Sequence, residues 1–120
     1  MTRLFVYGTL KRGCKNHHLL AAQSFVAEAR TAPGYRLHDL GDFPGMVADS
    51  TDTVGVTGEV WSVDATTLAQ LDAFEGVSEG LYYRLPVSLD PSYATETVHT
   101  YIYARSLHGH PALGPTWTET

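Results

Sequence analysis

The chain opens with a short apolar run that stops at a glycine. Leu4, Phe5 and Val6 are typical of a buried strand. Gly8 lets the backbone turn sharply or another group come close. The following residues, 8–13, are too basic and glycine-flanked for a core strand, so we expect an open loop whose free N–H groups could hold a carboxylate or an oxyanion. On these residues alone, an ordinary strand end and turn is an equally good interpretation.

The length and charge of the chain limit the classes of protein that it can belong to. Its 120 residues suffice for one domain with a sizeable core, and 43% of them are hydrophobic against 18% charged. The net charge of −5, with only 8 lysines and arginines, argues against a nucleic-acid-binding protein. The basic cluster of Lys11, Arg12 and Lys15 is interpreted as a solvated rim.

Cysteine usage and hydropathy indicate the compartment. The single cysteine, Cys14, excludes an internal disulfide framework and fits a reducing environment. No apolar run approaches the roughly 20 residues that span a bilayer, and the N-terminus leads straight into a strand without a leader pattern. We therefore expect a cytoplasmic protein with no membrane partner.

The rest of the pattern predicts an α+β fold. A short helix is expected at 17–22 with Asn16 as its N-cap, and a second from Ala65 to about Glu75 between the cap Asp64 and Gly76. Further strands are expected at 25–31, 35–40, 46–48, 54–63, 82–89 and 97–104, with a turn at Asp90-Pro91-Ser92. Because strands and helices do not alternate regularly, the class is α+β rather than a doubly wound sheet. Residues 1–105 form the expected domain and 106–120 an irregular C-terminal tail.

One carboxylate stands out at the end of the second helix. On a helical wheel Glu75 falls between Leu68 and Leu71, inside the stripe that must face the core. Burial and the negative end of the helix both raise the pKa of such a carboxyl group, which could then accept and return a proton near neutral pH. The wheel alone leaves open a frayed, solvent-facing Glu75, or an ion pair with Arg84.

Two blocks of sequence resemble a known family. Phe5–Gly13, followed by Asn16–Leu20, is similar to the opening signature of the γ-glutamyl cyclotransferase-like superfamily. Its small members include γ-glutamylamine cyclotransferases and avirulence-induced-gene-like proteins. Leu71–Gly76 and then Leu81–Arg84 resemble the family's catalytic helix end and the strand after it. The resemblance runs from about residue 3 to about residue 104.

The resemblance implies a fold, a reaction and a catalytic residue. The fold would be a small mixed β-barrel of about six or seven strands flanked by two short helices. The reaction would convert a γ-glutamyl amide to 5-oxoproline and a free amine, with Glu75 as general acid and base. Because the substrate supplies its own nucleophile, no cofactor and no metal are expected, and the expected partner is a small-molecule γ-glutamyl substrate.

Seven further residues are candidates for holding that substrate. The main-chain amides of the first loop would bind its carboxylate or the oxyanion, Tyr82 matches a tyrosine of the family pattern, and two tyrosines and an arginine could complete the pocket. These residues are Tyr7, Gly8, Thr9, Leu10, Tyr82, Arg84 and Tyr103. For the tyrosines and the arginine, packing in the core is an equally good interpretation.

Other interpretations are weaker. Cys14, His17 and His18 do not complete a four-ligand metal set, and His108-Gly109-His110 lies in a tail rich in proline and glycine. Cys14 as a nucleophile would need geometry that adjacent loop residues rarely provide. The main alternative function is a binding module of the same fold that turns nothing over. The identity of the leaving amine and the oligomeric state are not readable from the residues.

Overall fold

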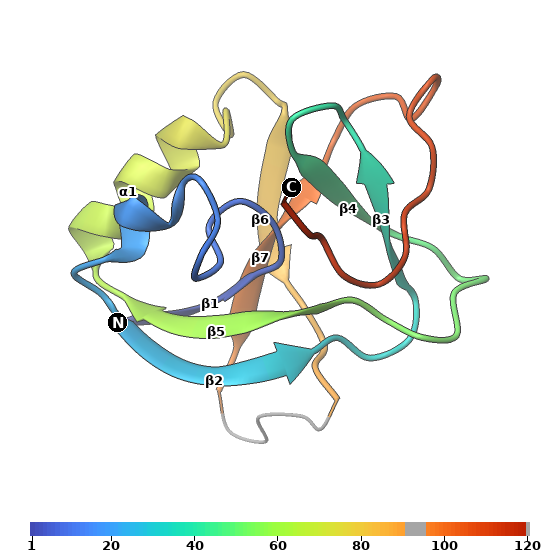
Figure 1. The fold of residues 1–120 in the computed structure, drawn as a ribbon. Helices are drawn as coiled ribbons and strands as arrows, with labels where there is room; N and C mark the ends of the chain where they lie inside the picture. The colour runs from blue at the N-terminus through green and yellow to red at the C-terminus, as the bar shows by residue number, and fades with distance from the viewer. Residues whose placement is uncertain (91–95, 120) are drawn as a thin grey trace.

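A mixed seven-stranded sheet forms the body of the molecule (Figure 1). The computed structural model describes residues 1–90 and 96–119. Its strands are β1 (Thr2–Val6), β2 (Ser24–Arg30), β3 (Tyr35–Asp39), β4 (Pro44–Ala48), β5 (Thr57–Val63), β6 (Tyr82–Pro86) and β7 (Val98–Tyr103). Its helices are the 3₁₀ helix η1 (His17–Leu20) and the α-helix α1 (Ala65–Phe74). The predicted α+β class is confirmed, while Pro91 and Ser92 of the expected turn lie outside the described residues.

Two strands, β1 and β4, share one edge of β7. The strand order is β2-β5-β1-β7-β4-β3, and β6 also pairs with β7. Antiparallel β6 takes one edge of β7 along almost its whole length. On the other edge β1 runs parallel to the start of β7 through Leu4 and His99, and β4 runs parallel to its end through Met46 and Ile102. The chain that leaves β1 therefore emerges where β4 joins the sheet.

The sheet is curved but open. Its outer strands on the long path are β2 and β3, and no ladder joins these two strands anywhere in residues 1–90 and 96–119. The mixed sheet of seven strands is as expected, but a closed barrel is not formed. The C-terminal residues occupy the free edge of β3 instead, since the N–H of Leu113 donates to the carbonyl of Leu37 at 2.8 Å.

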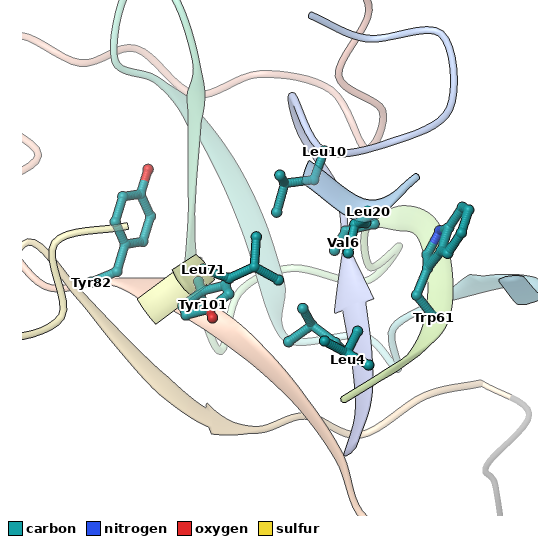
Figure 2. Close-up of a cluster of buried hydrophobic side chains, with 9 residues drawn as sticks. Leu4, Val6, Leu10, Leu20, Trp61, Leu71, Tyr82 and Tyr101 are labelled. Carbon is teal, nitrogen blue, oxygen red and sulfur yellow. The ribbon is translucent and has the colours of Figure 1, made fainter. Parts of the chain in front are cut away.

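Successive side chains of β1 enter two hydrophobic clusters, one on each face of the sheet. Leu4 and Val6 pack with Trp61 and with Leu71 of α1 (Figure 2). Phe5 and Tyr7 belong to the second cluster, which holds most of the remaining buried side chains. Both faces of β1 are thus covered, which explains its uninterrupted apolar run.

Helix α1 begins and ends close to the predicted positions. The side chain of Asp64 accepts a hydrogen bond from the N–H of Thr67 at 2.7 Å, as an N-cap should. The helix ends at Phe74, and Gly76 follows with φ of 68°, a conformation that favours glycine. No helix in the described part of the chain is long and apolar enough to cross a membrane.

The predicted capping role of Asn16 is wrong. Its side chain makes no capping bond to η1, which is a single 3₁₀ turn. The side-chain amide donates instead to the hydroxyl of Thr9 at 3.0 Å, and the N–H of Asn16 donates to the carbonyl of Thr9 at 3.0 Å. Asn16 therefore closes the first loop on itself, because the chain folds back there before the helix starts.

The C-terminal residues return to the first loop. The carbonyl of Pro115 accepts from the N–H of Thr57 at 2.8 Å, and the carbonyl of Trp117 accepts from Lys11 Nζ at 2.7 Å. In Figure 1 the end of the described C-terminal segment, drawn in red, accordingly lies beside the loop that follows β1. The tail thus connects β3, β5 and that loop.

Candidate active site

A cavity of about 120 Å³ lies where β1 leaves the sheet. Its walls come from the first loop, the start of β4, the end of α1 and the strands β6 and β7. Its lining consists of Phe5, Val6, Tyr7, Gly8, Thr9, Leu10, Asn16, Phe43, Pro44, Phe74, Glu75, Leu81, Tyr82 and Tyr101. The expected residues of the first loop therefore share one cavity with Glu75, although more than 60 positions in the chain separate them.

Glu75 is the only ionisable acid or base among these lining residues, apart from tyrosine hydroxyls. It follows the last residue of α1, and its N–H donates to the carbonyl of Leu71 at 2.8 Å. Its carboxylate has no hydrogen-bond partner within the described residues. Burial raises the pKa of Glu75 from its ordinary value of 4.5 to about 7. The group can therefore exchange a proton near neutral pH.

The first loop presents main-chain donors to the same cavity. Across the described chain, no acceptor is found for the N–H groups of Gly8, Thr9 and Leu10. These three residues are buried and line the cavity. Unpaired buried N–H groups are rare in proteins and suit a bound anion.

Gly8 is needed for a packing reason. A Cβ atom at this position would lie 2.7 Å from Cγ and 2.9 Å from Cδ of Pro44. Its φ is not positive, so the residue is not required by an unusual backbone conformation. The loop reaches the start of β4 only because this residue has no side chain.

Glu59 of β5 anchors the far end of the loop. One carboxylate oxygen accepts from the N–H of Arg12 and from the indole of Trp61, each at 3.1 Å, and the other accepts from Arg12 Nε at 3.1 Å. Burial alone would raise the pKa of this largely buried carboxyl group, but these hydrogen bonds outweigh it and keep the pKa below its ordinary value. Glu59 is not among the site residues that the sequence predicts. The sequence feature that could have identified Glu59 is an acidic residue between Gly58 and Val60, in a strand whose pattern predicts cover on both faces.

Tyr7, Tyr82 and Tyr101 share the cavity lining with Glu75, and the hydroxyl groups of the first two form hydrogen bonds with the main chain of neighbouring strands. Tyr7 donates to the carbonyl of Tyr101 at 2.7 Å and accepts from the N–H of Met46 at 3.2 Å. Tyr82 donates to the carbonyl of Pro44 at 2.8 Å. Burial, followed by the nearby charge of Glu75, raises the pKa of Tyr82. These bonds hold β1, β4, β6 and β7 together around the cavity.

Arg84 pairs with another acid. Its Nε lies 2.9 Å from one oxygen of Asp72 and its Nη2 lies 3.2 Å from the other, while the hydroxyl of Tyr101 donates to the first at 2.7 Å. Burial raises the pKa of Asp72, yet Arg84 and Tyr101 outweigh that effect and lower it. An ion pair of Arg84 with Glu75, one of the open alternatives, is wrong, and Arg84 does not line the cavity.

Tyr103 also lies outside the lining, where its ring packs edge-on against Tyr82 with centroids 5.5 Å apart. Tyr101 lines the cavity in its place. The two tyrosines are two positions apart in β7, so the period of a strand could not separate them. Of the other lining residues that sequence reasoning missed, Phe74 had a signal, because it directly precedes Glu75.

The alternative site around Cys14 is not assembled. Burial and then the charge of Glu119 raise the pKa of the half-buried Cys14 thiol, which makes it a poorer nucleophile. The ring of His17 packs on Trp61 at 5.1 Å, and its Nδ1 lies 2.9 Å from the carbonyl oxygen of Leu10. Residues 1–90 and 96–119 contain no group of three side chains that could hold a metal ion.

Comparison with known proteins places this arrangement in a family. The fold is an α+β domain with an open mixed sheet, and its cavity lies where β1 and β4 meet along one edge of β7. The family model described as "Gamma-glutamyl cyclotransferase, AIG2-like" matches residues 4–119. The chain belongs to this family, and the resemblance noted in the sequence is confirmed.

Individual relatives agree with that assignment. A "Putative gamma-glutamylcyclotransferase" of Vibrio cholerae is 38% identical over 105 residues, which cover 88% of this chain and 86% of that protein. The "Gamma-L-glutamyl-butirosin B gamma-glutamyl cyclotransferase" of Niallia circulans is 28% identical over 88% of this chain and 69% of its own length. The solution structure of ytfP from Escherichia coli superposes with a TM-score of 0.72 at 30% identity, covering 97% of this chain and 95% of that one.

Proposed function

We propose that this chain converts γ-glutamyl amides to 5-oxoproline and a free amine, with Glu75 as the general acid and base. The observation that carries the proposal is the meeting of Glu75 with the free N–H groups of residues 8–10 in one cavity. Membership of the family and the names of the relatives support the same reaction.

The reaction needs little covalent chemistry from the protein. The α-amine of the substrate attacks its own γ-carbonyl carbon and closes a five-membered ring. The protein's first task is to hold the glutamyl half in the bent conformation that brings these two atoms together. We assign this task to the loop N–H groups, which can bind the α-carboxylate, and to the rings of Tyr7 and Tyr82.

Proton transfer falls to Glu75. The ionised carboxylate takes a proton from the substrate ammonium group, which frees the amine for attack. After attack, the ring nitrogen carries one proton more than the product needs. The carboxylate, having released its first proton to solvent, takes this second proton and gives it to the leaving nitrogen as the bond from carbon to that nitrogen breaks. The released amine then takes a proton from solvent. The proton balance is zero over the cycle. A pKa of about 7 suits both directions of transfer.

The negative charge on the carbonyl oxygen needs a donor in the intermediate. The N–H groups of Gly8, Thr9 and Leu10 are the buried donors available in the described cavity. Donors fixed by a folded loop require no reorganisation when the charge develops. Tyr7, Tyr82 and Tyr101 contribute by shape, since their hydroxyl groups are bonded elsewhere.

The test compares the parent with Glu75→Gln, a variant of the same shape that cannot exchange a proton. Release of 5-oxoproline from a panel of γ-glutamyl amides is expected to fall by about 10²- to 10⁴-fold. Binding is followed with a glutaryl amide, which lacks the α-amine and cannot cyclise, and its affinity should be similar in both proteins. Treatment with a chelator should leave turnover unchanged.

Two results would contradict this proposal in different ways. Equal activity of the parent and Glu75→Gln would remove Glu75 from the mechanism. If the parent releases no 5-oxoproline from any donor yet binds the glutaryl amides, the chain is a non-catalytic binding module of the same fold.

A further inference from the structure

The lining of the cavity divides into a buried floor and a more exposed rim. Nine lining residues are buried: Phe5, Val6, Tyr7, Gly8, Thr9, Leu10, Pro44, Tyr82 and Tyr101. The other five are exposed (Phe74) or half-buried: Asn16, Phe43, Glu75 and Leu81. The cavity, about 120 Å³, is well below the roughly 300 Å³ at which pockets for drug-sized ligands begin. With the glutamyl half on the floor, the amine half must therefore lie along the rim.

The rim is apolar except for Asn16 and Glu75. Phe74 is 49% exposed at the end of α1, and Phe43 and Leu81 are half-buried beside β4 and β6. The side-chain amide of Asn16 already donates to Thr9. Large apolar side chains at the edge of a cavity mark contact with an apolar partner.

No lysine or arginine belongs to the described lining, and four of those in neighbouring segments are engaged elsewhere. The ammonium groups of Lys11 and Lys15 donate to the main-chain carbonyls of Trp117 and Asp42. The guanidinium of Arg12 pairs with Glu59 and lies 3.9 Å above the ring of Phe25. The guanidinium of Arg84 pairs with Asp72.

Building on the proposed function, we propose that the departing amine is apolar and uncharged, an alkyl or arylalkyl amine, with Phe74 and Phe43 as the residues that select it. An amino acid as leaving group would bring a carboxylate to the apolar rim. That carboxylate would lose hydration without gaining a cation, and it would lie near the charge of Glu75. A phenyl or alkyl group would instead cover Phe74 and gain from the burial of apolar surface.

A matched pair of donors tests this selection. γ-Glutamyl-phenethylamide and γ-glutamyl-phenylalanine carry the same ring and differ only by the carboxylate of the second. The expected kcat/KM for release of 5-oxoproline is about tenfold or more higher for the phenethylamide. Equal values, or a preference for γ-glutamyl-phenylalanine, overturn the inference. So does a preference for a γ-glutamyl amide of 1,4-diaminobutane over that of butylamine.

Substitution of a rim residue tests whether Phe74 selects the leaving amine. Phe74→Ala should reduce the preference for phenethylamide over methylamide donors by about tenfold, because the methyl group reaches little of the rim. Leu85→Ala is the matched control, since Leu85 is also exposed, at 44%, but lies on β6 outside the cavity. An unchanged preference in Phe74→Ala overturns the role of Phe74. If no donor yields 5-oxoproline the proposed function itself fails, whereas turnover without preference contradicts only the selection of the amine.

Discussion

The hydroxyl group of Tyr82 donates a hydrogen bond of 2.8 Å to the carbonyl oxygen of Pro44. The two residues belong to β6 and β4, which pair with opposite edges of β7 and not with each other. The ring of Pro44 also fills the space where a Cβ of Gly8 would lie. Pro44 therefore links the strand after Glu75 to the loop that faces this carboxylate.

Tyr82→Phe should lower the free energy of unfolding by about 1–2 kcal/mol, because a buried carbonyl loses its donor. The matched control is Tyr83→Phe on the next residue, whose side chain is 52% exposed. Urea denaturation monitored by tryptophan fluorescence measures both. Equal midpoints for Tyr82→Phe and the parent would show that the bond contributes nothing to stability.

Gly8→Ala should displace the first loop from β4, since the added carbon would lie 2.7 Å from the Pro44 ring. We expect a loss of about 1–3 kcal/mol in stability and a fall in turnover. Gly114→Ala serves as control, because nothing lies within 4 Å of a Cβ there and its φ is not positive. A fully active Gly8→Ala protein would mean that the loop tolerates a shift and that its N–H groups are not held in place.

Glu59→Gln should loosen the loop at Arg12. The charge-assisted bonds to Arg12 weaken while the shape stays the same, so stability should fall by about 1–2 kcal/mol and KM should rise. Glu28→Gln provides the comparison, since Glu28 contacts the same guanidinium from an 82% exposed position. Its expected effect is under about 0.5 kcal/mol. Equal effects of the two substitutions would contradict an anchoring role specific to Glu59.

The pH dependence of turnover should reflect Glu75. If its carboxylate must accept a proton from the substrate ammonium, kcat/KM should decline as the pH falls through about 7. An acid limb near the ordinary value of 4.5 would show that Glu75 is solvated in the free protein. Circular dichroism over the same range controls for unfolding.

Ionisation of Glu75, which should raise kcat/KM as the pH rises, should at the same time lower the free energy of unfolding. The pKa of this group is higher in the folded chain than in the unfolded chain, so its contribution is present below about pH 4.5 and is lost as the pH rises through about 7. Glu75→Gln does not carry this penalty. The free energy of unfolding of the variant should rise relative to that of the parent by roughly 3 kcal/mol between pH 4.5 and 8, measured by urea denaturation at each pH. A constant difference over that range would argue against a raised pKa.

Local sequence patterns predicted the positions of the helices and strands well, but not which distant residues would contact one another. Asp64 and Gly76 mark the ends of α1 because a cap and a left-handed glycine act within a few residues of one another. Asn16 had the residue type of a cap but bonds to Thr9, which lies seven positions earlier. Tyr101 and Tyr103 share the period of β7, and only the position of the neighbouring strands decides which one reaches the cavity.

The sequence by itself determined the strands, the capped helix, the glycine loop and an acid at the helix end, because burial patterns and caps are local properties of the chain. Its two blocks of residues also indicated the family. Only the tertiary structure decided that the sheet stays open, that Arg84 pairs with Asp72, and that Glu59 holds the first loop. These outcomes depend on which distant segments pack together. The raised pKa of Glu75 belongs with them, since the walls that exclude water from it come from four separate parts of the chain.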